Sequence, residues 1–226
     1  MLSKKINSII ILSFFVSLLM IQNNSVASNY SAGFSLGYNN GFGFQASGYL
    51  SNFAQDFPLK LRLSIGYTLT SNPGSSPDAR RIFINNATNG TPEKQGWFWD
   101  YKFDFMYRVN WLSLRQLYLY GGPRYESFTG NFKYIGGNED FDVITSQWGI
   151  GTGLQGFFSM SPTLDFTLSV GADYFFSSML KGHDTEYYPD NENVNPREDY
   201  NYNDADKAIN QPDLLLNFMI GINYKF

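Results

Sequence analysis

Apolar and polar side chains alternate along most of the chain with a period of two residues. The clearest case is the C-terminal segment 214–226, where large apolar side chains share one parity and mostly small or polar side chains share the other. The apolar parity consists of Leu214, Leu216, Phe218, Ile220, Ile222, Tyr224 and Phe226. Because successive side chains of a β-strand point to opposite faces, this period predicts a strand with one apolar face.

The same alternation recurs often enough to predict about eight strands, four of them strongly patterned and four weaker. The predicted strands lie around 30–38, 42–50, 59–69, 97–109, 117–125, 148–158, 164–176 and 214–226. Asn39-Asn40-Gly41 predicts a hairpin turn between the first two. Gly121, Gly122 and Pro123 interrupt the fifth, and because proline cannot donate to a ladder we expect a bulge or a strand end there.

The parity that carries the aromatic residues is too bulky to fill the interior of an eight-stranded barrel, so we expect it to face outward. The opposite parity is rich in glycine, serine and charges of both signs, and we expect it to line the lumen. The inward charges are Lys60, Arg62, Asp100, Lys102, Asp104, Arg108, Arg124, Glu126, Asp165, Asp173 and Lys225. Buried charges are costly unless they are paired, so this set predicts a network of ion pairs. The network is either a rigid polar plug or the gate of a narrow pore.

Long and short connections alternate along the chain. Segments 71–96, 129–146 and 178–212 are long, and all of them fall at one end of the predicted barrel. Membrane barrels have short periplasmic turns and longer outer loops. The fold predicted is therefore all-β, an eight-stranded antiparallel up-and-down transmembrane barrel, with extracellular loops and both termini periplasmic.

Composition agrees with a membrane barrel. Aromatic residues make up 18% of the 226 residues and charged residues only 16%, which is unusual for a soluble protein. The mean hydropathy of −0.28 nevertheless excludes a bundle of membrane helices. The formal net charge of −4 disfavours nucleic acid as a partner.

The N-terminus has the pattern of a secretory signal. Lys4 and Lys5 precede an apolar stretch at 9–21, and Ser25-Val26-Ala27 resembles a small-residue cleavage site. The alternative, a retained helical anchor, is disfavoured because a spanning helix needs about 20 apolar residues. We expect residues 1–27 to be a cleaved signal peptide and residues 28–226 to form one barrel domain. No cysteine is present to form disulfides or carry a lipid anchor.

With these features the chain resembles the small outer-membrane β-barrels of Gram-negative bacteria, the OmpA, OmpX and opacity-protein group. The C-terminal assembly signal of that group, a glycine followed by alternating aromatic or apolar residues, is matched by Gly221, Tyr224 and Phe226. Met219 stands where the group usually has a polar residue. The resemblance implies that the barrel-assembly machinery binds the chain transiently.

Candidate chemistry is sparse. The only histidine, His183, lies in a predicted long loop beside Asp184 and Glu186, whereas barrel enzymes that act on lipids or peptides pair a histidine with serine or aspartate near the outer rim. We therefore expect no enzyme, no cofactor and no resident metal. An outer-membrane lipid-modifying enzyme is a minor alternative.

Two loops are candidates for binding. Segment 178–212 is strongly acidic and interleaves four tyrosines with its acids, so it predicts solvated charge, a binding surface or a mobile lid. Its carboxylates could also hold calcium or bridge to lipopolysaccharide through divalent ions, although the ligand spacing of a calcium hand is missing. Segment 71–96 places Arg80 and Arg81 before the apolar run 82–84, which either extends a hairpin above the membrane or forms an exposed contact patch.

Trp97, Trp99 and Trp111 are expected to anchor the barrel at the membrane interfaces. The leading hypothesis is thus an outer-membrane protein with a structural or surface-interaction role. Its predicted partners are membrane lipid, lipopolysaccharide and an extracellular ligand bound through 71–96 and 178–212. The runner-up is a narrow porin-like channel for ions or small solutes.

Overall fold

A computed structural model describes residues 29–53, 57–70, 72–85, 90–111, 116–137, 139–197 and 199–226. The elements are β1 (Asn29–Asn39), β2 (Phe42–Ser51), β3 (Leu59–Thr70), α2 (Ser76–Phe83), β4 (Thr91–Val109), β5 (Leu117–Ile135), β6 (Asp140–Ser159), β7 (Leu164–Phe175), β8 (Leu180–Gly182), β9 (Thr185–Tyr187), α3 (Tyr202–Ala208) and β10 (Leu214–Lys225). None of the helices in these ranges is long and apolar enough to cross a membrane. The predicted signal peptide, 1–27, lies outside the described residues.

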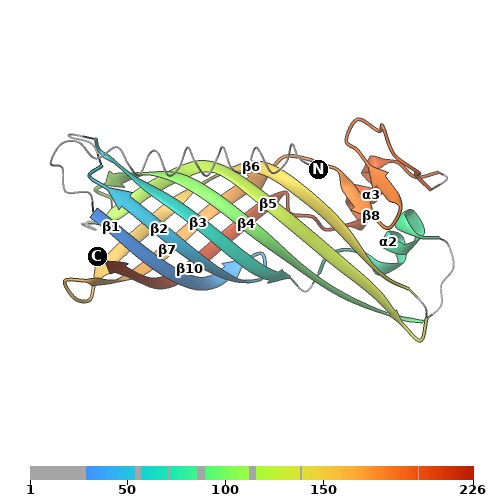
Figure 1. Cartoon of the computed structure of the whole chain (residues 1–226), viewed down its shortest axis with the longest axis horizontal. Helices are drawn as coiled ribbons and strands as arrows, with labels where there is room; N and C mark the ends of the chain where they lie inside the picture. Colours follow the sequence, from blue (N-terminus) through green and yellow to red (C-terminus); the bar gives the residue numbers. More distant parts are fainter. Residues whose placement is uncertain are drawn as a thin grey trace, which may run out of the picture.

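Eight long antiparallel strands form a closed barrel, which confirms the predicted fold (Figure 1). Each strand of the order β1 to β7 pairs with the next, and β10 pairs with both β7 and β1, so the sheet has no free edge within the barrel. The predicted hairpin between β1 and β2 is present, with Asn40 at a positive φ of 55°. Ser31 of β1 pairs with Lys225 of β10, so both strands have these ends at one end of the barrel, here called the terminal end.

The predicted orientation of the strands is also confirmed. Phe105 and Phe166 are 46% and 39% exposed on the outer wall, whereas Lys102, of the opposite parity, is only 6% exposed and points into the lumen. The apolar parity therefore covers the outside of the barrel, and the polar parity fills much of the inside.

β4, β5 and β6 are longer than the alternation predicted. Each has 19 or 20 residues, and much of the predicted loop 129–146 is strand, because β5 ends at Ile135 and β6 begins at Asp140. The physical reason is that the apolar residues move from the outward to the inward positions toward the end opposite the termini. We call this end the cap end. Lys133 and Asp142 point outward there, while Phe132 and Phe141 point inward and are buried. An apolar outer face no longer marks these residues as strand, because the apolar side has moved to the inside.

The bulge or strand end predicted at Gly121–Pro123 was wrong. β5 continues through this point, and its register with β4 is the same on both sides, since Lys102 pairs with Arg124 and Phe105 with Gly121. Only the two β4–β5 pairs in between are missing. The absence of a backbone N–H at Pro123 therefore does not shift the strand register. Gly122 permits this close approach, because a Cβ there would lie 2.0 Å from the carbonyl oxygen of Phe103.

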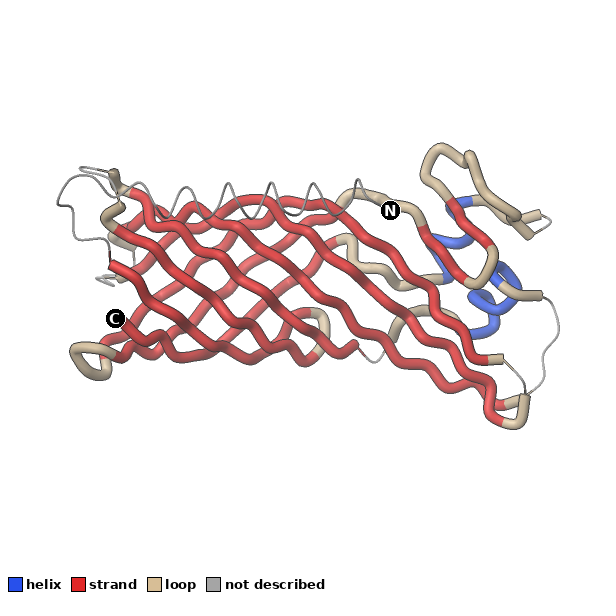
Figure 2. The backbone as a smooth tube through the Cα atoms, in the orientation of Figure 1, coloured by secondary structure: helices blue, strands red, loops and turns tan. Residues whose placement is uncertain are grey.

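The cap end is covered by α2, the β8–β9 hairpin and α3 (Figure 2). β6 extends beyond β7 toward the cap end, and β8 pairs with this extension at Val143 and Ile144. The apolar run 82–84 lies in and just after α2 and not in a hairpin extension. Ile82 and Phe83 are buried, which also contradicts the alternative of an exposed apolar patch. Much of segment 178–212 likewise forms ordered elements that pack over the barrel.

Candidate functional site

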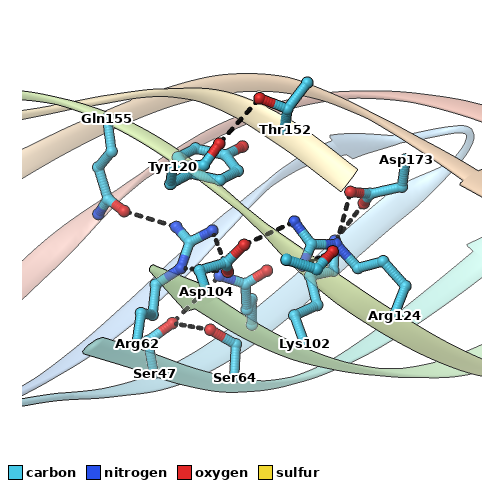
Figure 3. A network of polar contacts seen from close by, with 12 residues as sticks. Ser47, Arg62, Ser64, Lys102, Asp104, Tyr120, Arg124, Thr152, Gln155 and Asp173 are labelled. Atoms are coloured by element: carbon cyan, nitrogen blue, oxygen red, sulfur yellow. Dashed lines mark hydrogen bonds and ion pairs between the residues drawn. The ribbon is translucent and has the colours of Figure 1, made fainter. Parts of the chain in front are cut away.

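An ion-pair network fills the middle of the lumen (Figure 3). Asp104 on β4 accepts hydrogen bonds from Arg62 Nε and Nη2 on β3 at 2.9 and 2.7 Å. Its other oxygen lies 2.8 Å from Arg124 Nη2 on β5. Arg124 Nε in turn donates to Asp173 on β7 at 2.7 Å, and Lys102 Nζ donates to the second oxygen of Asp173 at 2.8 Å. These five buried side chains join strands from both sides of the barrel.

Hydrogen bonds extend the network toward both ends of the lumen. Toward the terminal end, Arg62 Nη1 donates to Gln155 at 2.6 Å, and Gln155 donates to the Tyr49 hydroxyl at 2.9 Å. The Arg62 guanidinium also lies 4.1 Å from the centre of the Tyr120 ring, in cation–π geometry. Toward the cap end, Asn39 Nδ2 donates to Asp100 at 3.3 Å. The chain of contacts therefore extends along the lumen on both sides of the ion pairs.

We call the seven charged residues at this level the ionic layer. They are Arg62, Asp100, Lys102, Asp104, Arg124, Glu126 and Asp173, all at most 6% exposed. Burying a charge is tolerable only when partners replace the lost water, and the short contacts above provide such partners for Arg62, Lys102, Asp104, Arg124 and Asp173.

An aromatic cage lies in the lumen on the terminal side of the ionic layer. The ammonium group of Lys60 sits 4.8, 5.4 and 4.2 Å from the ring centres of Tyr49, Tyr118 and Phe157. Phe157 also packs edge-on against both tyrosines. The lumen is thus narrowed there by three rings packed around a cation, which they contact in cation–π geometry.

On the cap side of the ionic layer, side chains of the barrel wall and of the cap share one apolar core. We call this cluster the cap core. Its buried members are Ala79, Ile82, Phe83, Phe98, Phe128, Phe132, Tyr134, Phe141, Val143, Phe175, Leu180, Tyr187, Tyr202, Ala205, Ala208, Ile209 and Leu215. The cap is therefore a part of the folded interior rather than a set of solvated loops.

Polar contacts fix the cap on this core. Tyr187 of β9 donates its hydroxyl to the carbonyl of Ile82 in α2 at 2.9 Å. Arg80 of α2 is buried, forms an ion pair with Glu139 and lies 4.7 Å from the ring centre of Tyr134. Burial raises the pKa of the Tyr187 phenol above its ordinary value of 10.0. Helix α2 is thereby held to the β8–β9 hairpin on one side and to the β5–β6 hairpin on the other.

Several acids of segment 178–212 are paired at the surface. Asp184 contacts the His183 ring at 3.0 Å and Arg197 at 2.7 Å, and these two contacts lower the pKa of its carboxyl. Lys181, across the β8–β9 hairpin, lowers the pKa of Glu186 in the same way. Within the described ranges, no group of three or more histidine, cysteine, aspartate or glutamate side chains is arranged to hold a metal ion.

The remaining predicted site residues lie at the two ends of the barrel. Lys225 forms an ion pair with Asp165 at 2.8 Å at the terminal end. Arg108 pairs with Tyr118 close to the terminal end of β4 and its side chain is exposed, so it lies at the terminal end of the barrel and not in the buried ionic layer. The neighbouring Val109 and Leu117 pair with each other at the strand ends and are buried, although they share the parity of the exposed Tyr107 and Leu119.

The predicted anchors and the predicted assembly signal are on the outer wall or at the terminal end. Trp99 and Trp111 are 44% and 52% exposed, and Trp97 is half-buried. Trp97 and Trp99 lie in the cap-end half of β4, whereas Trp111 follows the end of β4 on the terminal side. Tyr224 and Phe226 are exposed and contact each other edge-on, and Gly221 pairs with Ser35.

The sequence reasoning missed the aromatic residues of the lumen and of the cap core. Phe98 and Phe175 share the inward parity with the charges, as do Phe128 and Phe132. That shared parity was the signal that could have revealed them. Tyr49, which links the aromatic cage to Gln155, was missed as well, and inward parity was the signal there too.

The fold is similar to that of a major outer membrane protein from Thermus thermophilus. The two chains share 21% sequence identity, and the match has a TM-score of 0.69 and covers 88% of this chain and 100% of that chain. The attachment invasion locus protein Ail of Yersinia pestis matches 88% of this chain and 97% of its own at 15% identity, with a TM-score of only 0.43. No protein-family model and no curated protein matches the chain. The likeness to the Thermus protein shows the fold alone, a closed eight-stranded antiparallel β-barrel, as the sequence predicted.

Proposed function

We propose that this protein is an integral outer-membrane β-barrel whose lumen is closed and whose ordered cap forms an extracellular interaction surface. The observation that carries the proposal is the filling of the lumen by three successive layers: the aromatic cage, the ionic layer and the cap core. A barrel filled in this way is suited to holding a surface in place rather than to passing solutes.

The outer wall supports the membrane location. Its large apolar side chains are exposed on every barrel strand, as at Phe34, Leu63, Phe105, Ile150 and Ile220. A continuous apolar exterior of this extent is stable in hydrocarbon and would aggregate in water. Trp99, Tyr174 and Phe176 toward the cap end, and Trp111 and Tyr224 toward the terminal end, fit the two aromatic girdles of such barrels. We propose Trp97 as a further anchor.

In this proposal the cap end faces the exterior and the termini face the periplasm, because long connections gather at the outer end of membrane barrels. Residues 1–27 would be removed on export. Gly221, Tyr224 and Phe226 would be recognised transiently by the barrel-assembly machinery. Segments 71–96 and 178–212 would present the surface to an extracellular ligand or to lipopolysaccharide.

The closed lumen is tested by conductance in planar lipid bilayers. We expect the purified protein to give no reproducible current steps, because the pairs of Arg62 and Arg124 with Asp104 cross the lumen. Stable steps that change when Arg62→Gln or Asp104→Asn is introduced would favour the channel alternative. Asp140→Asn, at an exposed position of β6, is the matched control and should change nothing.

The surface role is tested separately by binding to purified lipopolysaccharide. A variant lacking 184–206 should still form a barrel that resists unfolding by detergent at room temperature, because the strand pairing of the barrel does not include these residues. We expect this variant to bind less lipopolysaccharide than the full chain. Equal binding by both would leave no role for the acidic part of the cap in this interaction.

A further inference from the structure

One carboxyl group of the ionic layer has no partner. Glu126 is fully buried on β5, and neither of its oxygens accepts a hydrogen bond. No lysine or arginine nitrogen among the described residues lies within the 4.0 Å of an ion pair with it. This is unlike Asp104 and Asp173, each of which contacts two cations.

The charges of the ionic layer show why Glu126 is left over. The layer contains three cations, Arg62, Lys102 and Arg124, but four carboxyl groups. The Lys102 ammonium group is already shared between Asp173 at 2.8 Å and Asp100 at 3.4 Å. If all four carboxyl groups were ionised, the layer would carry one negative charge that no buried cation balances.

The neighbours of Glu126 lack donors rather than acceptors. Asp100 on β4 and Gln147 on β6 are its direct partners across the two adjacent strands, and both point inward. Facing side chains of such pairs have Cβ atoms about 5 Å apart. Asp100 Oδ1 has only the shared Lys102 ammonium group, at 3.4 Å. Gln147 Oε1 accepts no hydrogen bond, and Gln147 Nε2 is directed to the Phe176 carbonyl instead. Asn39 Oδ1 and Thr145 Oγ1, near the same level, are unpartnered as well.

No other charged group is placed to relieve this arrangement. The charged groups that act on Glu126 are Asp100 and Lys102 from β4 and Asp173 from β7, with Arg124 two residues earlier on β5. The neighbours named above on β1 and β6, which are Asn39, Thr145 and Gln147, are neutral. Toward the cap, the next inward positions on β4 and β5 are Phe98 and Phe128, which are buried in the cap core. Ionisation there would place a second negative charge beside Asp100 and against an aromatic wall.

We propose that Glu126 is a proton-binding site of the lumen: its carboxyl group is protonated in the folded barrel at neutral pH and donates a hydrogen bond to Asp100 or Gln147. A buried carboxyl group without a cation is neutralised in preference to being buried as a charge. The proton brings the ionic layer to charge balance and supplies the donor that these acceptors lack. Because Glu126 lies directly beneath the cap core, this proton also keeps the boundary between the two layers free of net charge.

The test is infrared spectroscopy of the purified barrel in detergent at neutral pH. We expect the carbonyl stretch of a protonated carboxyl group, shifted in heavy water, in the wild-type protein. It should be lost in Glu126→Gln, which keeps the shape and supplies an amide donor. Glu139→Gln, in the cap, is the control and should keep the band. A wild-type spectrum without the band, or a band that survives in Glu126→Gln, would overturn the proposal.

A metal cation is the competing way to neutralise the site, and thermal unfolding separates the two. We expect the unfolding temperature at neutral pH to be the same in sodium, calcium and choline chloride at equal ionic strength. Stabilisation by sodium or calcium that disappears in Glu126→Gln would overturn the proposal in favour of a metal ion. If Glu126→Gln does not form a barrel, loss of the carbonyl band is measured in Glu126→Leu instead. The wild-type spectrum by itself still shows whether the band is present.

Discussion

At the scale of single residues, Asp104 is the side chain on which the middle of the lumen depends most. It is fully buried and contacts two guanidinium groups on different strands, Arg62 and Arg124. Replacing it would leave both buried cations with fewer partners. By contrast, Lys225 is 36% exposed where it pairs with Asp165. The two ion pairs have similar lengths, so the difference in their burial should decide how much each contributes to the free energy of unfolding.

We expect Asp104→Asn to lower the free energy of unfolding by about 3–5 kcal/mol, the usual cost of removing one member of a buried pair. Lys225→Gln should cost about 1 kcal/mol or less, because the pair at the terminal end is partly solvated. Urea unfolding of both variants in lipid vesicles, followed by tryptophan fluorescence, measures the difference. Equal losses in the two variants would show that burial does not set the strength of these pairs.

At the scale of elements, the period of two predicted eight strands correctly but misjudged where three of them end. β4, β5 and β6 rise beyond the apolar belt, so their outer faces become polar and their inner faces aromatic. The elements α2, β8, β9 and α3 close over this aromatic face. They are held by a few specific contacts, such as the buried hydrogen bonds from Tyr187 to the Ile82 carbonyl and from Thr185 to the Phe83 carbonyl.

The cap should loosen in alkaline solution. Burial raises the pKa of Tyr187 and of Tyr202 above their ordinary value of 10.0, so the folded cap holds these protons more tightly than the unfolded segment does. The resulting stability is complete below pH 10 and decreases as the pH rises above it. Limited proteolysis of 178–212 across this range measures the opening. Tyr187→Phe should move the onset of proteolysis to higher pH. An unchanged onset would show that ionisation of Tyr187 does not cause the cap to open.

At the scale of the whole molecule, the apolar belt separates a lipid-facing zone from a water-facing zone of the same strands. Ile65 and Ile144 illustrate the difference, because both point outward and are 41% and 42% exposed. Ile65 lies between Ala46 and Tyr101 in the middle of the belt. Ile144 pairs with Thr129 and Lys181, between outward-facing polar residues of the tall hairpin.

We expect Ile65→Arg to destabilise the barrel in lipid vesicles by about 2–4 kcal/mol, the cost of an arginine near the middle of the bilayer. Ile144→Arg should change the free energy of unfolding by about 1 kcal/mol or less, since its side chain already contacts water. Equal effects of the two substitutions, measured by the same urea unfolding, would contradict the proposed position of the membrane.

The sequence by itself determined the number of strands, their antiparallel order, the outward parity and the end at which long connections gather. These features depend on neighbours along the chain and on a uniform hydrocarbon exterior, so a local pattern records them. The inward charges were identified in the same way, since Arg62, Asp104 and Asp173 all share the polar parity.

Only the tertiary structure decided which of these charges meet. Arg62 pairs with Asp104 and Lys102 with Asp173, 42 and 71 residues away, because strand register sets which inward residues share a level. The same register leaves Glu126 without a cation. The tertiary structure also decided that Arg108 lies at the terminal end of the barrel, away from the ionic layer, and that Phe98 and Phe175 join a cap core. Those outcomes depend on where the strands leave the membrane and on what packs over their ends. A pattern of neighbouring residues specifies neither.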